Sequence, residues 1–330
     1  MLSRLFTIVL LALASLRVNA TSLTGVIITN EATSSSAVDV VAIDQVHTTI
    51  RSALADTVGG AQNQTEEARR EALKTYREFA EKEPETYLPD VAATLNDLGI
   101  LDSDQNRIEK ARKEFEEALK TYRELAHKEP DIYLRYVAIT LNNLGTLDSG
   151  KNRMNAARKE YAEVLKIYRD LAQKEPGTYL PYVPMTLNNL GFLDTAQYRW
   201  DEARKEVSEA LKIYGGLAQE DPETYLSHVA MTLNNLGVLD QDQNQLNEAR
   251  KEYEEALKIY RELAQKEPET YLPYVAATFN NLGILDSARN RPEGARKAFE
   301  EALKIYKSFA KQDPDQFSPL VERMKKLLKQ

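Results

Sequence analysis

The chain has 330 residues, of which 28% are charged and 42% are hydrophobic, a composition typical of a soluble globular protein. Its formal net charge of −8 at pH 7 argues against a nucleic-acid partner, because an acidic surface repels a phosphate backbone. We expect no metal and no cofactor, since there are no cysteines and the three histidines (47, 127 and 228) lack the spacing of ligands or of a catalytic triad.

Residues 1–20 are typical of a secretory signal peptide. Arg4 supplies a positive charge, an apolar run follows from Leu5 to Leu16, and Val18-Asn19-Ala20 fits the small-x-small cleavage pattern. The alternative is a membrane anchor, which requires roughly 20 apolar residues and therefore a longer run. We expect cleavage after Ala20, no membrane span in the mature chain, and a secreted or periplasmic location.

Residues 21–64 form a segment rich in Ser, Thr, Ala and Val. Residues 33–36 have the composition of a flexible linker, and the pattern over 38–54 is compatible with a short amphipathic helix. Asn63-Gln64-Thr65 is an N-glycosylation sequon, which is relevant only if the protein is eukaryotic. The sequence assigns no role to this segment.

From residue 65 onward the sequence repeats with a period of 46 residues. Leucine, proline and glycine each recur at this step: Leu73, Leu119, Leu165, Leu211, Leu257 and Leu303; Pro84, Pro130, Pro176, Pro222, Pro268 and Pro314; Gly99, Gly145, Gly191, Gly237 and Gly283. A fixed period of this length indicates stacked supersecondary units that share one continuous core.

Each unit divides into two helices. In the opening unit we expect a first helix over Tyr87–Ser103, a polar turn at 102–106, and a second helix over Ile108–Lys128. The proline that follows should end the second helix, because the residue before a proline avoids the α conformation. Recurrent tyrosines such as Tyr87 are expected in the linker between units.

The repeats define three parts of the solenoid. We expect a half-unit over 65–84, five full units over about 85–314, and a capping helix over 317–329. Both ends are more polar than the interior copies, as exposed terminal units require.

The pattern Leu95-x-x-Leu98-Gly99, followed by Ala111-x-x-x-Phe115-x-x-Ala118, resembles the tetratricopeptide repeat. The string Thr-Leu-Asn-Asn-Leu-Gly at 140–145 resembles the longer-helix variety of kinesin light chains. The resemblance implies an all-α fold, an α–α superhelix whose first helices line a concave groove. Independently of it, the recurrent glycines should let the two helices of a unit approach closely.

An aspartate stands three residues after each motif glycine, where the family usually has a tyrosine: Asp102, Asp148, Asp194, Asp240 and Asp286. An arginine follows the small alanine of each second helix: Arg112, Arg158, Arg204, Arg250 and Arg296. A buried carboxylate is costly unless it is paired, so one hypothesis is a structural ladder of Asp–Arg bridges. The alternative is that each aspartate caps a turn and faces water.

A polar pair recurs in the middle of each first helix, as in Asn142-Asn143. The resemblance implies that the first asparagine of each pair lies in the groove and bonds an extended peptide backbone: Asn96, Asn142, Asn188, Asn234 and Asn280. Apolar contacts would come from neighbouring positions such as Met185, Met231 and Phe192. The alternative is that the asparagines bond neighbouring helices and hold the stack together.

These features favour a non-catalytic scaffold that binds a protein or peptide outside the cytoplasm. The alternative is a structural or self-assembling repeat protein, in which the same faces stack on other copies of the chain. An enzyme is not expected, because no nucleophile–base pair, glycine-rich phosphate loop or metal cluster stands out. The sequence does not identify the partner.

Overall fold

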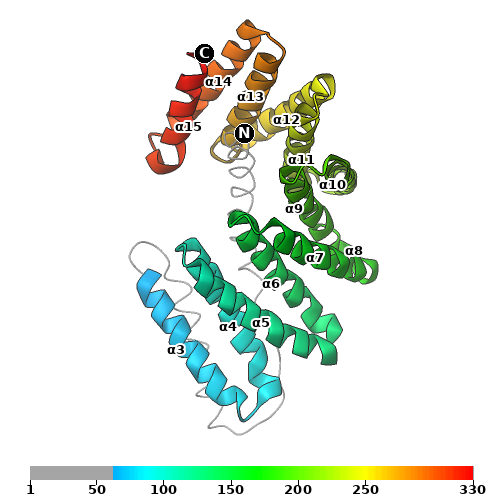
Figure 1. Cartoon of the computed structure of the whole chain (residues 1–330), viewed down its shortest axis with the longest axis vertical. Coiled ribbons are helices and arrows are strands. Elements are labelled where there is room, and N and C mark those ends of the chain that lie inside the picture. Colours follow the sequence, from blue (N-terminus) through cyan, green and yellow to red (C-terminus); the bar gives the residue numbers. More distant parts are fainter. Residues whose placement is uncertain (1–61, 330) are drawn as a thin grey trace. The chain divides into compact units, whose positions relative to one another are not determined.

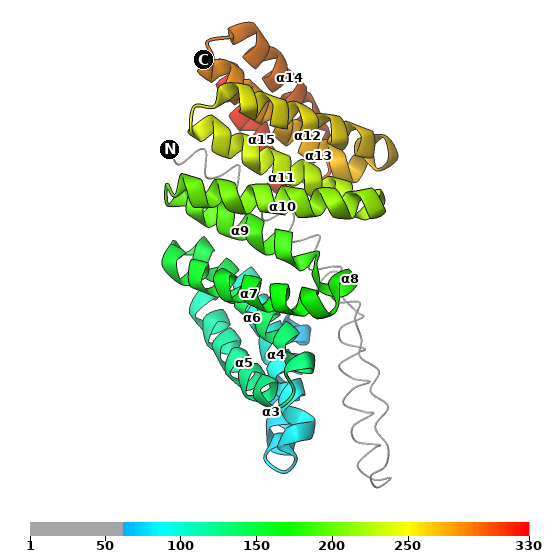
Figure 2. The same cartoon turned by 90° about the vertical axis from the view of Figure 1, so that its right-hand side faces the viewer.

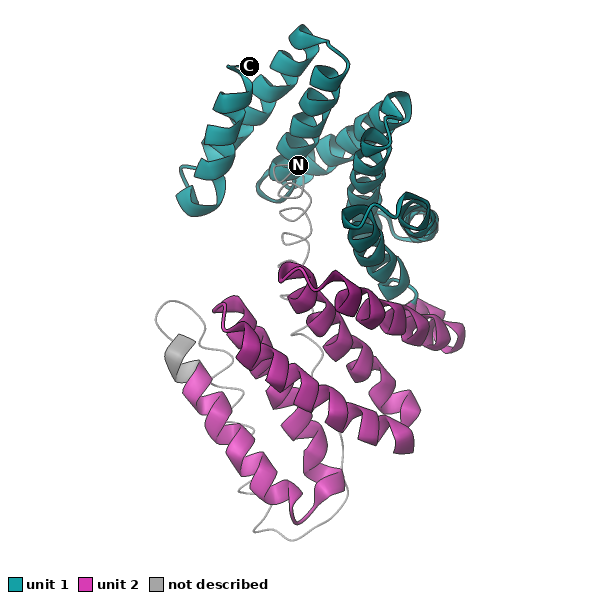
Figure 3. Ribbon diagram, viewed as in Figure 1, with its two compact units in different colours: residues 1–25, 180–330 teal, residues 26–179 magenta. Residues whose placement is uncertain are grey.

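The computed structural model describes residues 62–329, with side chains from Glu66 onward. The expected signal peptide (1–20), the expected short helix (38–54) and the Asn63 side chain therefore lie outside the described residues. Within 62–329 the chain forms α-helices joined by short turns and contains no strand (Figure 1). The helices fall into two compact units, which we call the N-terminal unit (up to Tyr179) and the C-terminal unit (from Leu180) (Figure 3).

Consecutive helices pack against each other within each unit and form successive helical hairpins (Figures 1 and 2). The N-terminal unit contains α3 (Gln62–Ala80), α4 (Pro84–Asp104), α5 (Ile108–Lys128), α6 (Pro130–Gly150), α7 (Met154–Lys174) and α8 (Pro176–Tyr179). The C-terminal unit contains α9 (Tyr182–Ala196), α10 (Trp200–Glu220), α11 (Pro222–Asp242), α12 (Leu246–Lys266), α13 (Pro268–Ala288), α14 (Pro292–Phe309) and α15 (Pro314–Leu327).

The first helices begin three residues earlier than the sequence predicts, because each starts at the recurrent proline. Pro84 and Pro130 occupy the first turn of α4 and α6, where the missing N–H would have had no partner in the helix. The preceding residue is extended, as at Glu129 (φ −132°, ψ 72°), so the second helix does end there. Tyr87 and its equivalents consequently lie in the first turn of a helix, and their assignment to a linker is corrected.

The turn inside each hairpin contains one residue in the left-handed region. Asparagine occupies this position at Asn106, Asn152, Asn244 and Asn290, with φ between 56° and 62°. Asparagine tolerates this conformation better than most residues. The first helix therefore continues to Asp104 in the opening unit, into the segment expected to form the turn.

One first helix is interrupted. The segment that corresponds to a single helix elsewhere is divided into α8 and α9. Pro181 and Pro184 both lie at this break. Pro89 and Pro273 occupy the register of Pro181 inside unbroken helices, so the additional proline at 184 explains the difference. It removes the backbone donor that would bond the carbonyl four residues earlier.

The core of each hairpin forms where the second helix packs on the motif glycine. A Cβ atom on Gly99 would lie 2.6 Å from the Phe115 ring, and one on Gly237 would lie 2.6 Å from the Tyr253 ring. Ala111 and Ala118 of the second helix are fully buried. The predicted close approach of the two helices is therefore confirmed. An aromatic ring lies beside four of the motif glycines, and Val207 lies beside Gly191.

The last helix, α15, begins at Pro314 rather than at 317. Its apolar side chains Phe317, Val321 and Met324 are buried against α14. The opposite face, with Lys325 and Lys326, is exposed. No helix between residues 62 and 329 has both the length and the apolar character needed to cross a bilayer.

Candidate interaction face of the first helices

In the C-terminal unit the first asparagines of α9 and α11 bond the next first helix, whereas Asn280 of α13 donates to its neighbour Asn281 at 3.4 Å. Asn188 Nδ2 donates to Thr232 Oγ1 at 2.9 Å, and Asn234 Nδ2 donates to Thr278 Oγ1 at 2.9 Å. Each threonine donates its own hydroxyl proton to the carbonyl four residues earlier, at 2.8 and 2.9 Å. These two series of hydrogen bonds connect α9 to α11 and α11 to α13.

The structure corrects the prediction that Asn188, Asn234 and Asn280 lie open in a groove. Their exposed fractions are 6%, 1% and 2%, and Asn188 and Asn234 are bonded to the next first helix. In this unit the alternative interpretation, that the asparagines hold the stack, describes the geometry. The Oδ1 atom of each is buried without a donor among the described residues, so each amide keeps one unused acceptor.

The N-terminal unit has a related amide contact with different partners. Asn143 Nδ2, from the second position of its pair, donates to Asn96 Oδ1 at 3.0 Å and joins α6 to α4. Asn96, Asn142 and Asn143 are all partly exposed. The amides of this unit are therefore more accessible than those between α9 and α13.

A stripe of side chains on α4 is open to solvent. Ala93, Asp97 and Ile100 are exposed, and their spacing of four and three residues places them on one face of the helix. Asp97 is the second residue of its polar pair. The sequence pattern selected Asn96 instead, because it does not show which of two adjacent residues the next first helix covers.

The same register in the C-terminal unit is apolar and partly exposed. Its side chains on α9 and α11 are Met185, Phe192, Met231 and Val238. We call these four residues the open stripe of the C-terminal unit, and Ala93, Asp97 and Ile100 the open stripe of α4. Methionine and other adaptable apolar side chains beside fixed amides are suited to contacts with a polypeptide.

Most buried aspartates pair with an arginine of the preceding second helix, and Asp102, Asp148 and Asp194 also lie near an arginine of their own hairpin. Three such ion pairs join a second helix to the first helix that follows it: Arg112–Asp148, Arg204–Asp240 and Arg250–Asp286. Asp194 is bonded by Arg199, five residues later, at 2.9 Å from Nε. Arg296 is exposed over 74% of its side chain and bonds Glu300 at 2.9 Å, while Arg158 is partly buried.

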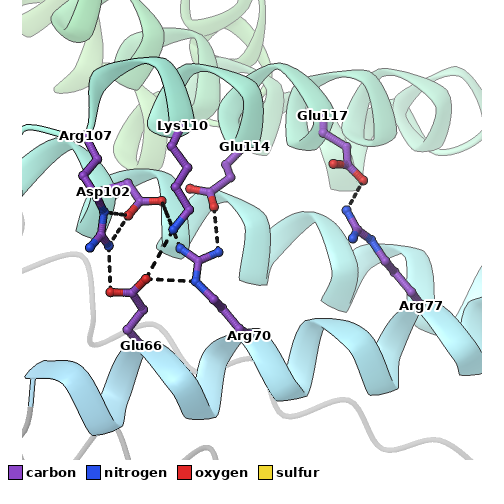
Figure 4. A network of polar contacts seen from close by, with 8 residues as sticks. All are labelled: Glu66, Arg70, Arg77, Asp102, Arg107, Lys110, Glu114 and Glu117. Atoms are coloured by element: carbon purple, nitrogen blue, oxygen red, sulfur yellow. Dashed lines mark hydrogen bonds and ion pairs between the residues drawn. The ribbon is translucent and has the colours of Figure 1, made fainter.

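Figure 4 shows how the first aspartate is paired, in a network on α3, α4 and the start of α5 formed by Glu66, Arg70, Asp102, Arg107, Lys110 and Glu114. Glu66 occupies the register of the ladder arginines, so α3 lacks one there. Arg70, one turn later, replaces it and reaches Asp102 Oδ2 at 3.0 Å. A hydrogen bond from Arg107 is the main reason that the pKa of Glu66 is lowered to about 2.

Carboxylates between consecutive second helices are shifted in the opposite direction. Burial raises the pKa of Glu160 on α7 and of Glu252 on α12 to about 7. Arg112 faces Glu160 and Arg204 faces Glu252, and each arginine opposes this shift. Each of these arginines also bonds an aspartate, so its positive charge only partly offsets the effect of burial on the glutamate pKa.

Among residues 62–329 there is no group of three or more His, Asp or Glu side chains placed to hold a metal ion. The polar groups of the first helices bond neighbouring helices or face solvent. The arrangement provides contact surface and hydrogen-bonding groups.

Comparisons with known proteins agree with the repeat architecture. Two family models, both described as tetratricopeptide repeat, match residues 182–262 and 228–308 in one case and residues 91–126 and 137–175 in the other. No curated protein sequence matches the chain.

Similar folds occur in solved structures. BtubC (BKLC) from P. vanneervenii is 23% identical, with a TM-score of 0.60 over 76% of this chain and 93% of its own. The apo form of RapI is 14% identical, with a TM-score of 0.59 over 86% and 95% of the two chains. Aspartyl phosphate phosphatase F from Bacillus subtilis is 13% identical, with a TM-score of 0.56 over 87% and 78%.

At these identities the likeness concerns the fold. The paired helices, the glycine–aromatic contact and the two matching family models lead to one conclusion. This chain belongs to the tetratricopeptide-repeat family and is an all-α repeat solenoid.

Proposed function

We propose that the protein is a non-catalytic scaffold that binds a protein or peptide segment along its first helices. The observation that supports this most directly is the open stripe. Within the C-terminal unit its side chains repeat at one register on α9 and α11 and stay partly exposed, although the equivalent Ala277 of α13 is buried. A repeated, partly apolar strip of this kind fits an elongated polypeptide better than a small molecule.

The amides next to the stripe support the same function. In the N-terminal unit Asn96 and Asn143 are partly exposed, and the bond between them uses only Asn143 Nδ2 and Asn96 Oδ1, so Asn96 Nδ2 and Asn143 Oδ1 can bond a peptide backbone. In the C-terminal unit the corresponding first asparagines fix the spacing of the helices that present Met185 and Met231. The amides thus have a binding role in one unit and a supporting role in the other.

The site of action in this proposal is outside the cytoplasm, in the periplasm or after secretion. This part rests on residues 1–20, whose charge, apolar run and small-residue motif are those of a signal peptide. The absence of cysteine from the sequence means that folding requires no disulfide and is compatible with either compartment.

Affinity capture from the extracytoplasmic fraction of the native source tests the binding function. The wild type is compared with the double variant Phe192→Ser/Met231→Ser, which keeps the fold but removes apolar contact from the stripe. The control is Glu116→Gln/Glu254→Gln, which changes exposed side chains of second helices. We expect the stripe variant to lose the captured protein and the control to retain it, at equal helicity. Capture that survives in both variants contradicts the proposal.

Self-assembly is the competing function, in which the stripe contacts another copy of the chain. Light scattering over a hundredfold range of protein concentration distinguishes self-assembly from binding of a different protein. We expect a constant molar mass. A mass that rises with concentration in the wild type but not in Phe192→Ser/Met231→Ser assigns the stripe to self-association.

A further inference from the structure

Basic residues are segregated between the two kinds of helix. The first helices α4, α6, α8, α9, α11 and α13 contain no lysine and a single arginine, Arg135. The second helix α5 alone contains Lys110, Arg112, Lys113, Lys120, Arg123 and Lys128. A partner that lies along the first helices therefore meets almost no positive charge on them.

The one arginine of the first helices is engaged elsewhere. The Arg135 guanidinium donates to Tyr136 Oη at 2.9 Å and lies over the Tyr136 ring, 4.7 Å from its centroid. This position is near the first turn of α6, several residues before the register of the open stripe in that helix. Arg135 lies one turn before Ile139 on the same face of α6, so it is the one cation of the first helices near this register, and α4 itself has none.

Most carboxylates of the first helices are neutralised. Asp148, Asp240 and Asp286 are buried and pair with arginines of the second helices. Asp97 differs, because it is exposed on the stripe between Ala93 and Ile100 and makes no ion pair with a described residue. Desolvation raises the pKa of Asp97, and Arg69 on α3 opposes this shift at longer range.

We propose that the open stripe of α4 binds a partner segment that carries a lysine or arginine beside apolar residues, and that the first helices reject acidic segments. This inference rests on the proposed function and specifies the chemistry of the partner. A cation next to Asp97 gains a charge-assisted hydrogen bond while its apolar neighbours contact Ala93 and Ile100. An acidic side chain at the same place meets a like charge and no cation of the first helices.

Three labelled nonapeptides test the inference by fluorescence anisotropy at pH 7. They share leucines at alternate positions and carry lysine, glutamine or glutamate at the others. We expect the full-length protein to bind the lysine peptide most tightly and the glutamate peptide most weakly, and salt to reduce the difference because it screens exposed charges. Equal or tighter binding of the glutamate peptide overturns the inference.

The variant Asp97→Asn tests how much the negative charge of Asp97 contributes to peptide binding. Asparagine occupies this register naturally at Asn143, Asn189 and Asn235, so the variant is compatible with the fold. Glu124→Gln removes the same charge from an exposed position on α5 and is the matched control. We expect Asp97→Asn to weaken the lysine peptide about fivefold and the glutamine peptide little, and Glu124→Gln to change neither. An unchanged affinity of Asp97→Asn for the lysine peptide overturns the inference.

Ile100→Ser separates this inference from the proposed function. If the stripe is a binding surface, the variant weakens the lysine and glutamine peptides alike, because both use the apolar contact. Loss of binding in Ile100→Ser without a charge preference leaves the function standing and refutes the inference. No binding of any peptide up to millimolar concentration contradicts both.

Discussion

Arg112 on α5 bonds the buried Asp148 on α6, 36 residues further along the chain. The two residues belong to different hairpins, so the ion pair connects one repeat to the next. The same connection recurs as Arg204–Asp240. In this family the place of the aspartate usually holds a packed tyrosine, and here charge pairing replaces that packing.

Arg112→Met should strongly destabilise the N-terminal unit. The substitution leaves the buried Asp148 carboxylate with only the more distant Arg153, 3.7 Å away, and breaking a buried pair costs about 3 kcal/mol or more. Urea unfolding followed by circular dichroism measures the change. Arg296→Met is the control, since this arginine occupies the same register but is exposed and bonds only a neighbour on its own helix; its effect should stay within about 0.5 kcal/mol.

Gly237→Ala and Gly216→Ala should shift thermal stability in opposite directions. A Cβ on Gly237 meets the Tyr253 ring at 2.6 Å, so overpacking should outweigh the better helix propensity and cost about 1 kcal/mol or more. A Cβ on Gly216 meets nothing within 4 Å, so alanine should stabilise α10 by about 1 kcal/mol. Equal shifts for both variants would show that the glycine–ring contact has no energetic role.

Thr278→Val should weaken the joint between α11 and α13. The valine has the same shape but leaves Asn234 Nδ2 buried without an acceptor, at a cost of about 1–3 kcal/mol. Thr94→Val is the control, because Thr94 is only partly buried and bonds the backbone of its own helix. Chemical denaturation of the two variants should differ by more than 1 kcal/mol; similar midpoints would mean that the amide contributes little.

Glu252→Gln should alter how stability depends on pH. Because folding raises the pKa of Glu252 from 4.5 to about 7, the folded state holds a proton that the unfolded state loses between these values. The contribution of this group to stability is therefore intact below pH 4.5 and falls as pH rises to 7. The variant should match the wild type at pH 5 and exceed its stability by roughly 1 kcal/mol at pH 8, allowing for solvent screening.

The matched control for this pH dependence is Glu255→Gln, an exposed position on the same helix. It should reproduce the wild-type difference between pH 5 and pH 8. If Glu252→Gln also shows the wild-type difference in stability between pH 5 and pH 8, then folding does not raise the pKa of Glu252 between α10 and α12.

The sequence predicted the repeat, its two helices and the close contact at Gly99, because these depend on periodicity within one hairpin. It did not predict which of Asn96 and Asp97 faces solvent. Adjacent helical residues point about 100° apart, so the answer depends on how the next first helix covers the one before it. The partner of Asp148 was undetermined for the same reason, since packing between hairpins decides it.

The most direct test of the central claim is site-specific photo-crosslinking of the protein in the extracytoplasmic fraction of its source. A photoreactive phenylalanine analogue replaces Met231 on the open stripe, and in a second variant it replaces Lys258, which is exposed on the second helix α12. The account predicts a crosslinked partner from position 231 and none from position 258. A partner captured from position 258 alone, or from neither position, would contradict binding along the first helices.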